Sequence, residues 1–134
     1  MKLAKHWIAA CALLLASGWS ALAQTISSPK GGLQLHFSLT NEGVPTYRLS
    51  FANGEEIIRQ SRLGLEMTDG KKSFDKGLEV TGTKESTFDE TWTPVWGEVK
   101  QIRNHYNELL VELKKKSNGD PIAIRFRLFD DGLG

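Results

Sequence analysis

Five segments of this chain carry an apolar side chain at every second position, and this pattern restricts the fold more than any other feature. A period of two is that of a β-strand with one buried face, whereas a helix needs a period near 3.6. No window longer than about ten residues fits the helical period. Gly, Asn and Asp residues that favour turns separate the segments. The alternating segments span residues 33–39, 47–51, 63–67, 109–113 and 122–128.

The spacing of these segments predicts an all-β fold, an antiparallel β-sandwich. Their outward positions carry Arg, Glu, Lys and Ser, as expected for strands with one wet face. A chain of 134 residues has room for one domain, and 40% hydrophobic and 25% charged residues are ordinary for a globular protein. The formal net charge of +1 and the lack of a basic stripe give no reason to expect a nucleic-acid partner.

The first 23 residues have the pattern of a secretory signal peptide. Lys2 and Lys5 precede an apolar run at 7–16, and Ala-Leu-Ala at 21–23 is a small-x-small cleavage site. The run is too short to span a bilayer, so we expect no membrane span. A signal peptide directs export, and we expect a periplasmic location. The mature domain then comprises residues 24–134. A lipoprotein is the alternative, because Cys11 follows Ile-Ala-Ala, but apolar residues continue beyond that cysteine.

Residue types with catalytic or metal-binding chemistry form no motif in this chain. The three histidines, at positions 6, 36 and 105, have no close pair, and the single cysteine lies in the predicted signal peptide. A glycosidase pair is defined by a separation in space of about 5 to 9.5 Å. Sequence spacing does not give this distance for the candidate acids Asp89, Glu90, Glu98 and Glu108. We therefore assign no catalytic residue and no metal ligand.

Two tryptophans, Trp92 and Trp96, flank Pro94 in a segment dense in aromatic and charged residues. Because proline cannot donate a hydrogen bond to a strand ladder, this segment is predicted to form a loop. One interpretation is a loop anchored by buried indoles. The other is a sugar-stacking or pocket-lining loop, since the flat faces of indoles suit the C–H surfaces of pyranose rings.

A polar cluster follows at 103–108 and contains Arg103, Asn104 and His105. Its many donors and acceptors could form a structural hydrogen-bond network that fixes the loop. They could also bind hydroxyl or carboxylate groups at the rim of a pocket. His105 is the only residue of this cluster whose side chain can titrate near neutral pH.

The end of the sequence has the pattern of an incomplete sheet. Residues 122–129 are predicted to form a central strand, 130–132 a turn, and Leu133 and Gly134 the start of another strand. An open, partly hydrophobic sheet edge is a feature that native proteins avoid. On this ground we expect the sandwich to be truncated at its C-terminal side.

The sequence resembles the N-terminal domain of glycoside hydrolase family 97. The resemblance rests on the strings FDETWTPVWGEVKQIRNHYNEL and IAIRFRLFDDGLG, and on SSPKGGLQLHFSL, GVPTYRLSF and SRLGLEM upstream. It covers nearly all of the mature chain. The family comprises secreted bacterial α-glucosidases and α-galactosidases, in which a β-sandwich precedes a catalytic (β/α)₈ barrel and a small β domain.

The resemblance implies a parent enzyme that hydrolyses α-linked oligosaccharides with calcium as cofactor. The catalytic carboxylates of the family lie on the barrel, and none of the family's catalytic or calcium positions maps onto this sequence. The segment 92–107 is expected to pack on the barrel of the same full-length chain and to reach toward the pocket rim. The residues expected in this substrate-binding or barrel-interface role are Trp96, Glu98, Arg103, Asn104 and His105.

Two other interpretations compete with this one. A stand-alone carbohydrate-binding β-sandwich would use Trp92, Trp96 and the neighbouring polar groups to hold a glycan without cleaving it. A remnant of a gene would fold locally and yield no stable secreted product.

Overall fold

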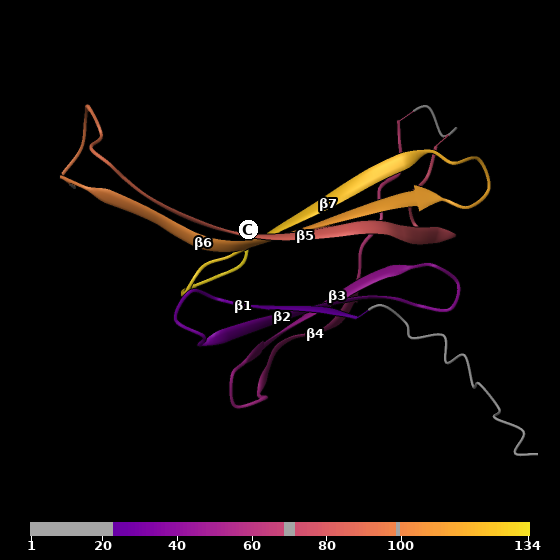
Figure 1. Ribbon diagram of the computed structural model, residues 1–134, viewed down its shortest axis with the longest axis horizontal. Coiled ribbons are helices and arrows are strands. Elements are labelled where there is room, and N and C mark those ends of the chain that lie inside the picture. Colours follow the sequence, from indigo (N-terminus) through magenta and orange to yellow (C-terminus); the bar gives the residue numbers. More distant parts are fainter. Residues whose placement is uncertain (1–22, 69–71, 99) are drawn as a thin grey trace, which may run out of the picture.

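The computed structural model describes residues 23–68, 72–98 and 100–134. They form seven β-strands in two antiparallel sheets that lie face to face (Figure 1). The described residues include no helix, and so none that is long and apolar enough to cross a membrane. The predicted all-β sandwich is confirmed. The predicted signal peptide lies outside the described residues except for Ala23.

The first sheet is a meander of four strands in sequence order. Short turns join its strands, and Gly31, Gly43 and Gly54 supply the positive φ angles that these turns need. The register from β2 to β3 is continuous, from Leu33 opposite Phe51 to Leu39 opposite Pro45. The strands are β1 (Gln24–Ser27), β2 (Leu33–Leu39), β3 (Pro45–Phe51) and β4 (Glu56–Arg62).

The second sheet has three strands, again in sequence order: β5 (Leu78–Trp92), β6 (Ile102–Lys115) and β7 (Pro121–Leu128). β5 and β6 form one long ladder, from Leu78 opposite Lys115 to Trp92 opposite Ile102, with a single register shift between Val80 and Gly82. β7 pairs with the C-terminal half of β6 only. The far half of the β5–β6 ladder therefore extends past the third strand.

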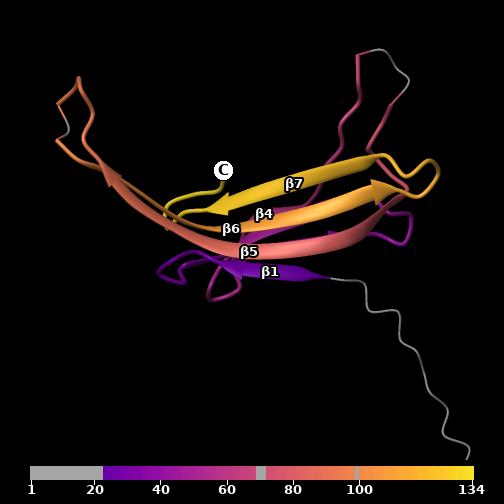
Figure 2. The same ribbon diagram turned by 45° about the horizontal axis from the view of Figure 1, so that its top comes forward.

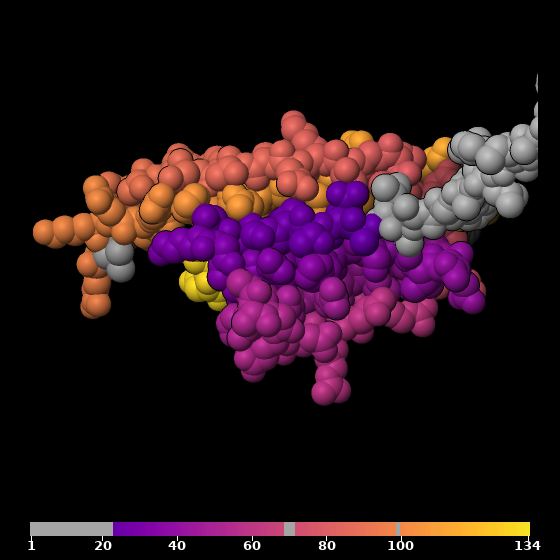
Figure 3. Space-filling model, turned by 60° about the horizontal axis from the view of Figure 1, so that its bottom comes forward, coloured from indigo at the N-terminus to yellow at the C-terminus, as the bar shows by residue number. Residues whose placement is uncertain are grey.

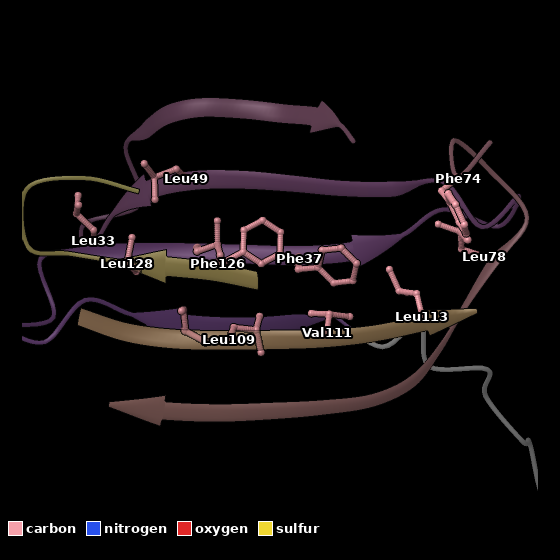
Figure 4. Packing of buried hydrophobic residues seen from close by; sticks show 12 residues of the cluster. Leu33, Phe37, Leu49, Phe74, Leu78, Leu109, Val111, Leu113, Phe126 and Leu128 are labelled. Carbon is pink, nitrogen blue, oxygen red and sulfur yellow. The ribbon is translucent and has the colours of Figure 1, made fainter. Parts of the chain in front are cut away.

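The hydrophobic core fills the space between the two sheets (Figure 4). Leu35 and Phe37 of β2 are fully buried, and so are Leu109 and Val111 of β6. The ring of Phe37 lies 5.8 Å from that of Phe126 on β7, centroid to centroid. The alternation in the sequence thus turns one face of each sheet toward the other, which removes the apolar side chains from water.

The two sheets are also joined through the backbone at one end of the sandwich. Leu78, at the start of β5, donates its N–H to the carbonyl of Gly43, and Gly77 donates to the carbonyl of Glu42. The approach is so close that a Cβ atom on Gly43 would collide with the backbone nitrogen and oxygen of Leu78. Gly43 is therefore required here both for its φ of 72° and for its small size.

One predicted strand is wrong. Residues 63–67 alternate but are largely irregular, with one isolated bridge from Glu66 to Ser73, and the fourth strand is β4 instead. β4 has mostly exposed residues on both faces because it is an edge strand, so its sequence carries no period-two signal. β1 and β5 were not predicted either. Most of β5 projects beyond the core, where no buried face imposes alternation.

The predicted turn after β7 is confirmed. Phe129 donates its N–H to the carbonyl of Gly132, and Leu133 forms a bridge with Leu128. Leu133 packs against the core cluster. The chain therefore returns along the side of β7 that faces away from β6.

Candidate functional site

The far half of the β5–β6 ladder projects from the sandwich as a long hairpin (Figure 2). We call residues 88–106 the arm: five residues of β5, a tip at 93–101, and five residues of β6. Every residue of β5 from 83 to 92 is exposed. In the space-filling view the arm reaches past the layer formed by the first sheet (Figure 3).

The arm is a pleated ribbon, so neighbouring residues point to opposite faces. This alternation divides the residues that the sequence grouped together. Arg103 and His105 share one face with Asp89, whereas Asn104 lies on the other face opposite Glu90. Trp96 and Glu98 lie at the tip, outside both strands. The structure therefore brings Arg103 and His105 together and separates them from the other three predicted residues.

The polar face of the arm is organised by Asp89 and Arg103. The Nε and Nη2 atoms of Arg103 donate to the two carboxylate oxygens of Asp89 at 2.8 and 2.7 Å. These hydrogen bonds lower the pKa of Asp89, and the charges of Arg103 and His105 lower it further. Desolvation raises the pKa, but this effect is weaker than that of the hydrogen bonds. The same contacts raise the pKa of Arg103. Both groups therefore stay charged across the physiological range.

At the base of the arm, the same face is tied to the first sheet. Thr87 donates its hydroxyl hydrogen to the side-chain oxygen of Asn107 at 2.8 Å. Asn107 in turn donates from Nδ2 to the backbone carbonyl of Ser27, at the end of β1, also at 2.8 Å. Ser27, Thr87 and Asn107 line a shallow polar cavity of about 230 Å³. The arm thus leaves the sandwich from an anchored base.

The opposite face of the arm carries an aromatic cluster. Phe88 and Tyr106 are stacked, with ring centroids 5.1 Å apart. The ring centroid of Phe129 lies 5.2 Å from that of Tyr106. The guanidinium of Arg127 lies over the Tyr106 ring at 5.0 Å and also donates to Glu108 at 3.1 Å. Arg125 makes a second ion pair with Glu108. This cluster stiffens the ribbon where it leaves the three-stranded part of the sheet.

The tip is the most exposed apolar part of the described chain. Val95 and Trp96 are 90% and 86% exposed, and Trp92 is 48% exposed. The interpretation of a loop anchored by buried indoles is therefore wrong. The predicted loop at 92–107 is also too long, because Trp92 ends β5 and β6 already begins at Ile102.

Two of the four candidate acids are engaged in ion pairs. Asp89 is engaged by Arg103, and Glu108 is held by two arginines. Glu90 and Glu98 are exposed at separate places, one on a strand and one at the tip. Across residues 23–68, 72–98 and 100–134, no three His, Cys, Asp or Glu side chains are grouped so that they could hold a metal ion.

Sequence reasoning gave no role to Phe88 and Val95. Asp89 was weighed only as a possible catalytic acid, although it lies directly opposite His105 and next to Arg103. The available signal was the match of acids in 85–90 with bases and amides in 103–107, which is the pattern of cross-strand pairs.

Fold and arm together define a two-layer antiparallel β-sandwich domain that presents one exposed hairpin. The glycosyl-hydrolase 97 N-terminal family matches residues 26–134. Because the match covers most of the sequence, the chain belongs to this family.

Solved structures and a characterised enzyme agree with this assignment. A retaining alpha-galactosidase of Bacteroides thetaiotaomicron is 27% identical over 109 residues, which is 81% of this chain and 15% of that protein. A family 97 enzyme of Pseudoalteromonas sp. strain K8, solved with panose, superposes with a TM-score of 0.73 at 27% identity, over 82% of this chain and 16% of that one. A beta-arabinopyranosidase superposes with a TM-score of 0.70 at 27% identity, over 80% and 16%. The chain thus spans about a sixth of the length of these relatives.

Proposed function

We propose that this chain is the N-terminal sandwich portion of a secreted α-glycosidase, and that its arm docks on the catalytic barrel of the same protein. The observation that carries the proposal is the tip of the arm, where Val95 and Trp96 are exposed on a projecting hairpin. Family membership and the enzymes named above support the link to a glycoside hydrolase. The substrate class would be α-linked glucosides or galactosides, and the location the periplasm.

The arm has the physical properties of a preformed docking element. Large apolar side chains cluster at interfaces because their burial there is favourable, and Trp is enriched among the residues that dominate binding energy. The ion pair of Asp89 with Arg103 and the stack of Phe88 on Tyr106 hold the two strands together before any partner binds. Less conformational entropy is then lost on docking.

This domain and the barrel would have different roles in the enzyme. The barrel would supply the acid and base carboxylates, while the arm would fix the barrel's position and extend one wall toward the glycan. The calcium that the family resemblance implies does not fit the described residues, because their possible ligands are not grouped.

The test uses the full-length enzyme with Trp96→Ala, and with the triple replacement of Trp96, Arg103 and His105 by alanine. A docking role predicts a lower thermal midpoint, and a pocket role predicts a lower kcat/KM. Ile57→Ala is the control, because Ile57 is another exposed apolar residue but lies on β4, away from the arm. An unchanged kcat/KM in the triple variant removes the pocket role, and an unchanged midpoint removes the docking role as well.

A second candidate function is glycan binding by this domain alone. It is favoured by one observation: Phe88 and Trp92 lie on one face of the arm with Glu90 between them, which alternates aromatic surface with a hydrogen-bonding group. Calorimetry of the isolated chain with panose separates the two candidates. Binding that is lost in Trp92→Ala supports the second function, and no binding at millimolar panose leaves the docking role.

A further inference from the structure

The dipeptide Asn-Gly occurs twice in this chain, and both copies lie in exposed hairpin turns. Asn53-Gly54 is in the turn between β3 and β4, and Asn118-Gly119 is in the turn between β6 and β7. Because glycine has no side chain to block the approach, its backbone nitrogen can attack the amide carbon of the preceding asparagine. The glycine proton leaves with the side-chain nitrogen as ammonia, and water then opens the succinimide ring to aspartate or isoaspartate. Both turns are therefore candidate sites of deamidation.

The two turns present the attacking nitrogen in nearly the same way. Each glycine has a positive φ, 89° at Gly54 and 76° at Gly119. Apart from the adjoining residues, no atom lies within 4 Å of a Cβ built on either glycine, so solvent reaches both. The N–H of Gly54 donates to the carbonyl of Phe51 at 2.9 Å, and that of Gly119 to the carbonyl of Lys115 at 2.8 Å. Attack requires the release of this bond in both turns.

The amide oxygen under attack is also held in the same way in both turns. It accepts a hydrogen bond from the backbone N–H two residues further on. The distance is 3.0 Å from the nitrogen of Glu55 to Oδ1 of Asn53. It is 3.1 Å from the nitrogen of Asp120 to Oδ1 of Asn118. Negative charge develops on this oxygen as the ring closes, so the N–H stabilises the transition state in both turns.

The turns differ at the nitrogen that leaves as ammonia. Nδ2 of Asn118 donates to Oδ2 of Asp120 at 3.1 Å, and Lys72 holds the same carboxylate oxygen at 3.1 Å. Within the described residues, Nδ2 of Asn53 has no such acceptor. Rotation of the Asn118 amide toward the glycine nitrogen therefore breaks a hydrogen bond to a charged group, which is stronger than a neutral one. The amide of Asn53 turns without this loss.

Nearby charges act in the opposite direction. Glu55 and Glu56 are exposed acids close to Asn53 in the sequence, and Lys116 is an exposed base close to Asn118. Negative charge opposes the loss of the glycine proton, whereas positive charge favours it. Because these side chains are exposed, dissolved salt screens their effect. At high salt, the hydrogen bond at Nδ2 therefore decides which asparagine reacts faster.

We propose that Asn53 is a site of spontaneous deamidation in the folded protein and that its counterpart Asn118 is protected. The product places a new carboxylate in the turn between β3 and β4, and its isoaspartyl form lengthens the backbone there by one carbon. The N–H of Phe51 donates to the carbonyl of Glu55 at 2.8 Å and closes this hairpin, so the longer backbone disturbs the closure. Because water is the only other reactant, the modification accumulates with the age of the molecule.

The test follows both asparagines in one sample. The full-length protein is incubated at mildly alkaline pH and high salt, folded in one series and unfolded in guanidinium chloride in another. Trypsin then releases peptides 49–59 and 117–125, each with one Asn-Gly, and mass spectrometry measures the conversion of amide to acid. In the folded series, Asn53 should convert about tenfold faster than Asn118. In the unfolded series the two rates should be similar, because the hydrogen bonds are absent.

The variant Asp120→Ala isolates the cause of the difference. It should raise the rate of Asn118 to that of Asn53, which serves as the control in the same molecule, and circular dichroism verifies that the variant is folded. Equal rates in the folded wild-type protein, or faster conversion of Asn118, would overturn the proposal. So would an intact Asn53 in the folded protein after the unfolded protein has reacted, or an unchanged rate of Asn118 in the variant. No measurement here depends on glycosidase activity, so the docking of the arm keeps its own test.

Discussion

The two halves of the β5–β6 ladder are made of the same strands in one pairing but are stabilised by different forces. In the base, Leu109, Val111 and Leu113 lie buried between two sheets. In the arm, the same ladder runs on without a second sheet against it, and cross-strand pairs such as Asp89 with Arg103 take the place of the core. Burial contributes far more per residue than exposed pairs do. The base therefore determines whether the domain folds. The sequence of the arm can change to suit the partner that it contacts without preventing folding.

An isolated two-stranded ribbon is marginally stable in water. The arm keeps its form because its base is anchored through Asn107 to Ser27 and because Phe88, Tyr106 and Arg127 pack where it leaves the sheet. Its exposed tip adds nothing to this anchoring. The described residues leave its apolar side chains in water, and the docking proposal supplies a contact for them.

The strongest test of this comparison is to truncate one apolar side chain in the base and one in the arm. Leu109→Ala should cost about 4 kcal/mol of unfolding free energy, because it leaves a cavity between the sheets. Trp96→Ala should change it by less than about 0.5 kcal/mol in the isolated chain, since the indole is already in water. Urea denaturation followed by far-ultraviolet circular dichroism measures both values. Similar losses in the two variants would show that the tip packs on the domain itself.

A pair of glycines extends the comparison to the backbone. Gly43→Ala should cost about 3 kcal/mol, because it combines an unfavourable φ with a collision against Leu78. Gly97→Ala, at the tip, should cost about 1 kcal/mol, because its φ of 122° is also unfavourable but no atom lies within 4 Å of the added Cβ. Thermal and urea unfolding of both variants provide the comparison. The contact of Gly43 with Leu78 would be refuted if the two costs were equal.

The smallest expected effect concerns the ion pair of the arm. Because the hydrogen bonds of Arg103 lower the folded pKa of Asp89, the pair's contribution is present above the pKa of the unfolded carboxyl and is lost as the pH falls through the folded pKa. In Arg103→Gln, the pKa of Asp89 should rise toward its ordinary value. Carbon-detected NMR titration of the carboxyl measures it, with Lys84→Gln, on the exposed part of β5, as the control. A pKa of Asp89 that is the same in both variants would contradict the pairing.

The sequence predicts those strands whose inward side chains are buried. β2 and β7 have alternating apolar residues because they cover the core, and both were predicted within a residue or two. β5 carries KESTFDETW over its outer part, where no face is buried, and its ladder depends on backbone hydrogen bonds that no side-chain period records. Residues 63–67 show the reverse error. Leu63 and Leu65 line an apolar cavity from an irregular segment, so here the period of two occurs without a strand.

The form of the projecting hairpin was not predicted, although it lies within the segment that the sequence marks by its density of aromatic and charged residues. Pro94 suggested a loop throughout, yet it interrupts only the tip, and the ladder resumes at Ile102. Which side chains meet depends on the register of β5 with β6. A register is fixed by turn geometry and burial across the pair, and a nine-residue tip with polar residues on both strands leaves it weakly specified in the sequence.

The order of the strands carries a consequence for how the domain folds. Both sheets are simple meanders, β1-β2-β3-β4 and β5-β6-β7, so each strand pairs with its neighbour in the chain. Apart from the β5–β6 hairpin with its nine-residue tip, every turn within the sheets is short, and closing a short loop loses little entropy. Each sheet can assemble from local hairpins, and only their docking requires contacts distant in sequence. Low contact order of this kind speeds folding relative to interleaved sandwiches, and it shortens the time for which unpaired strand edges are exposed to other chains.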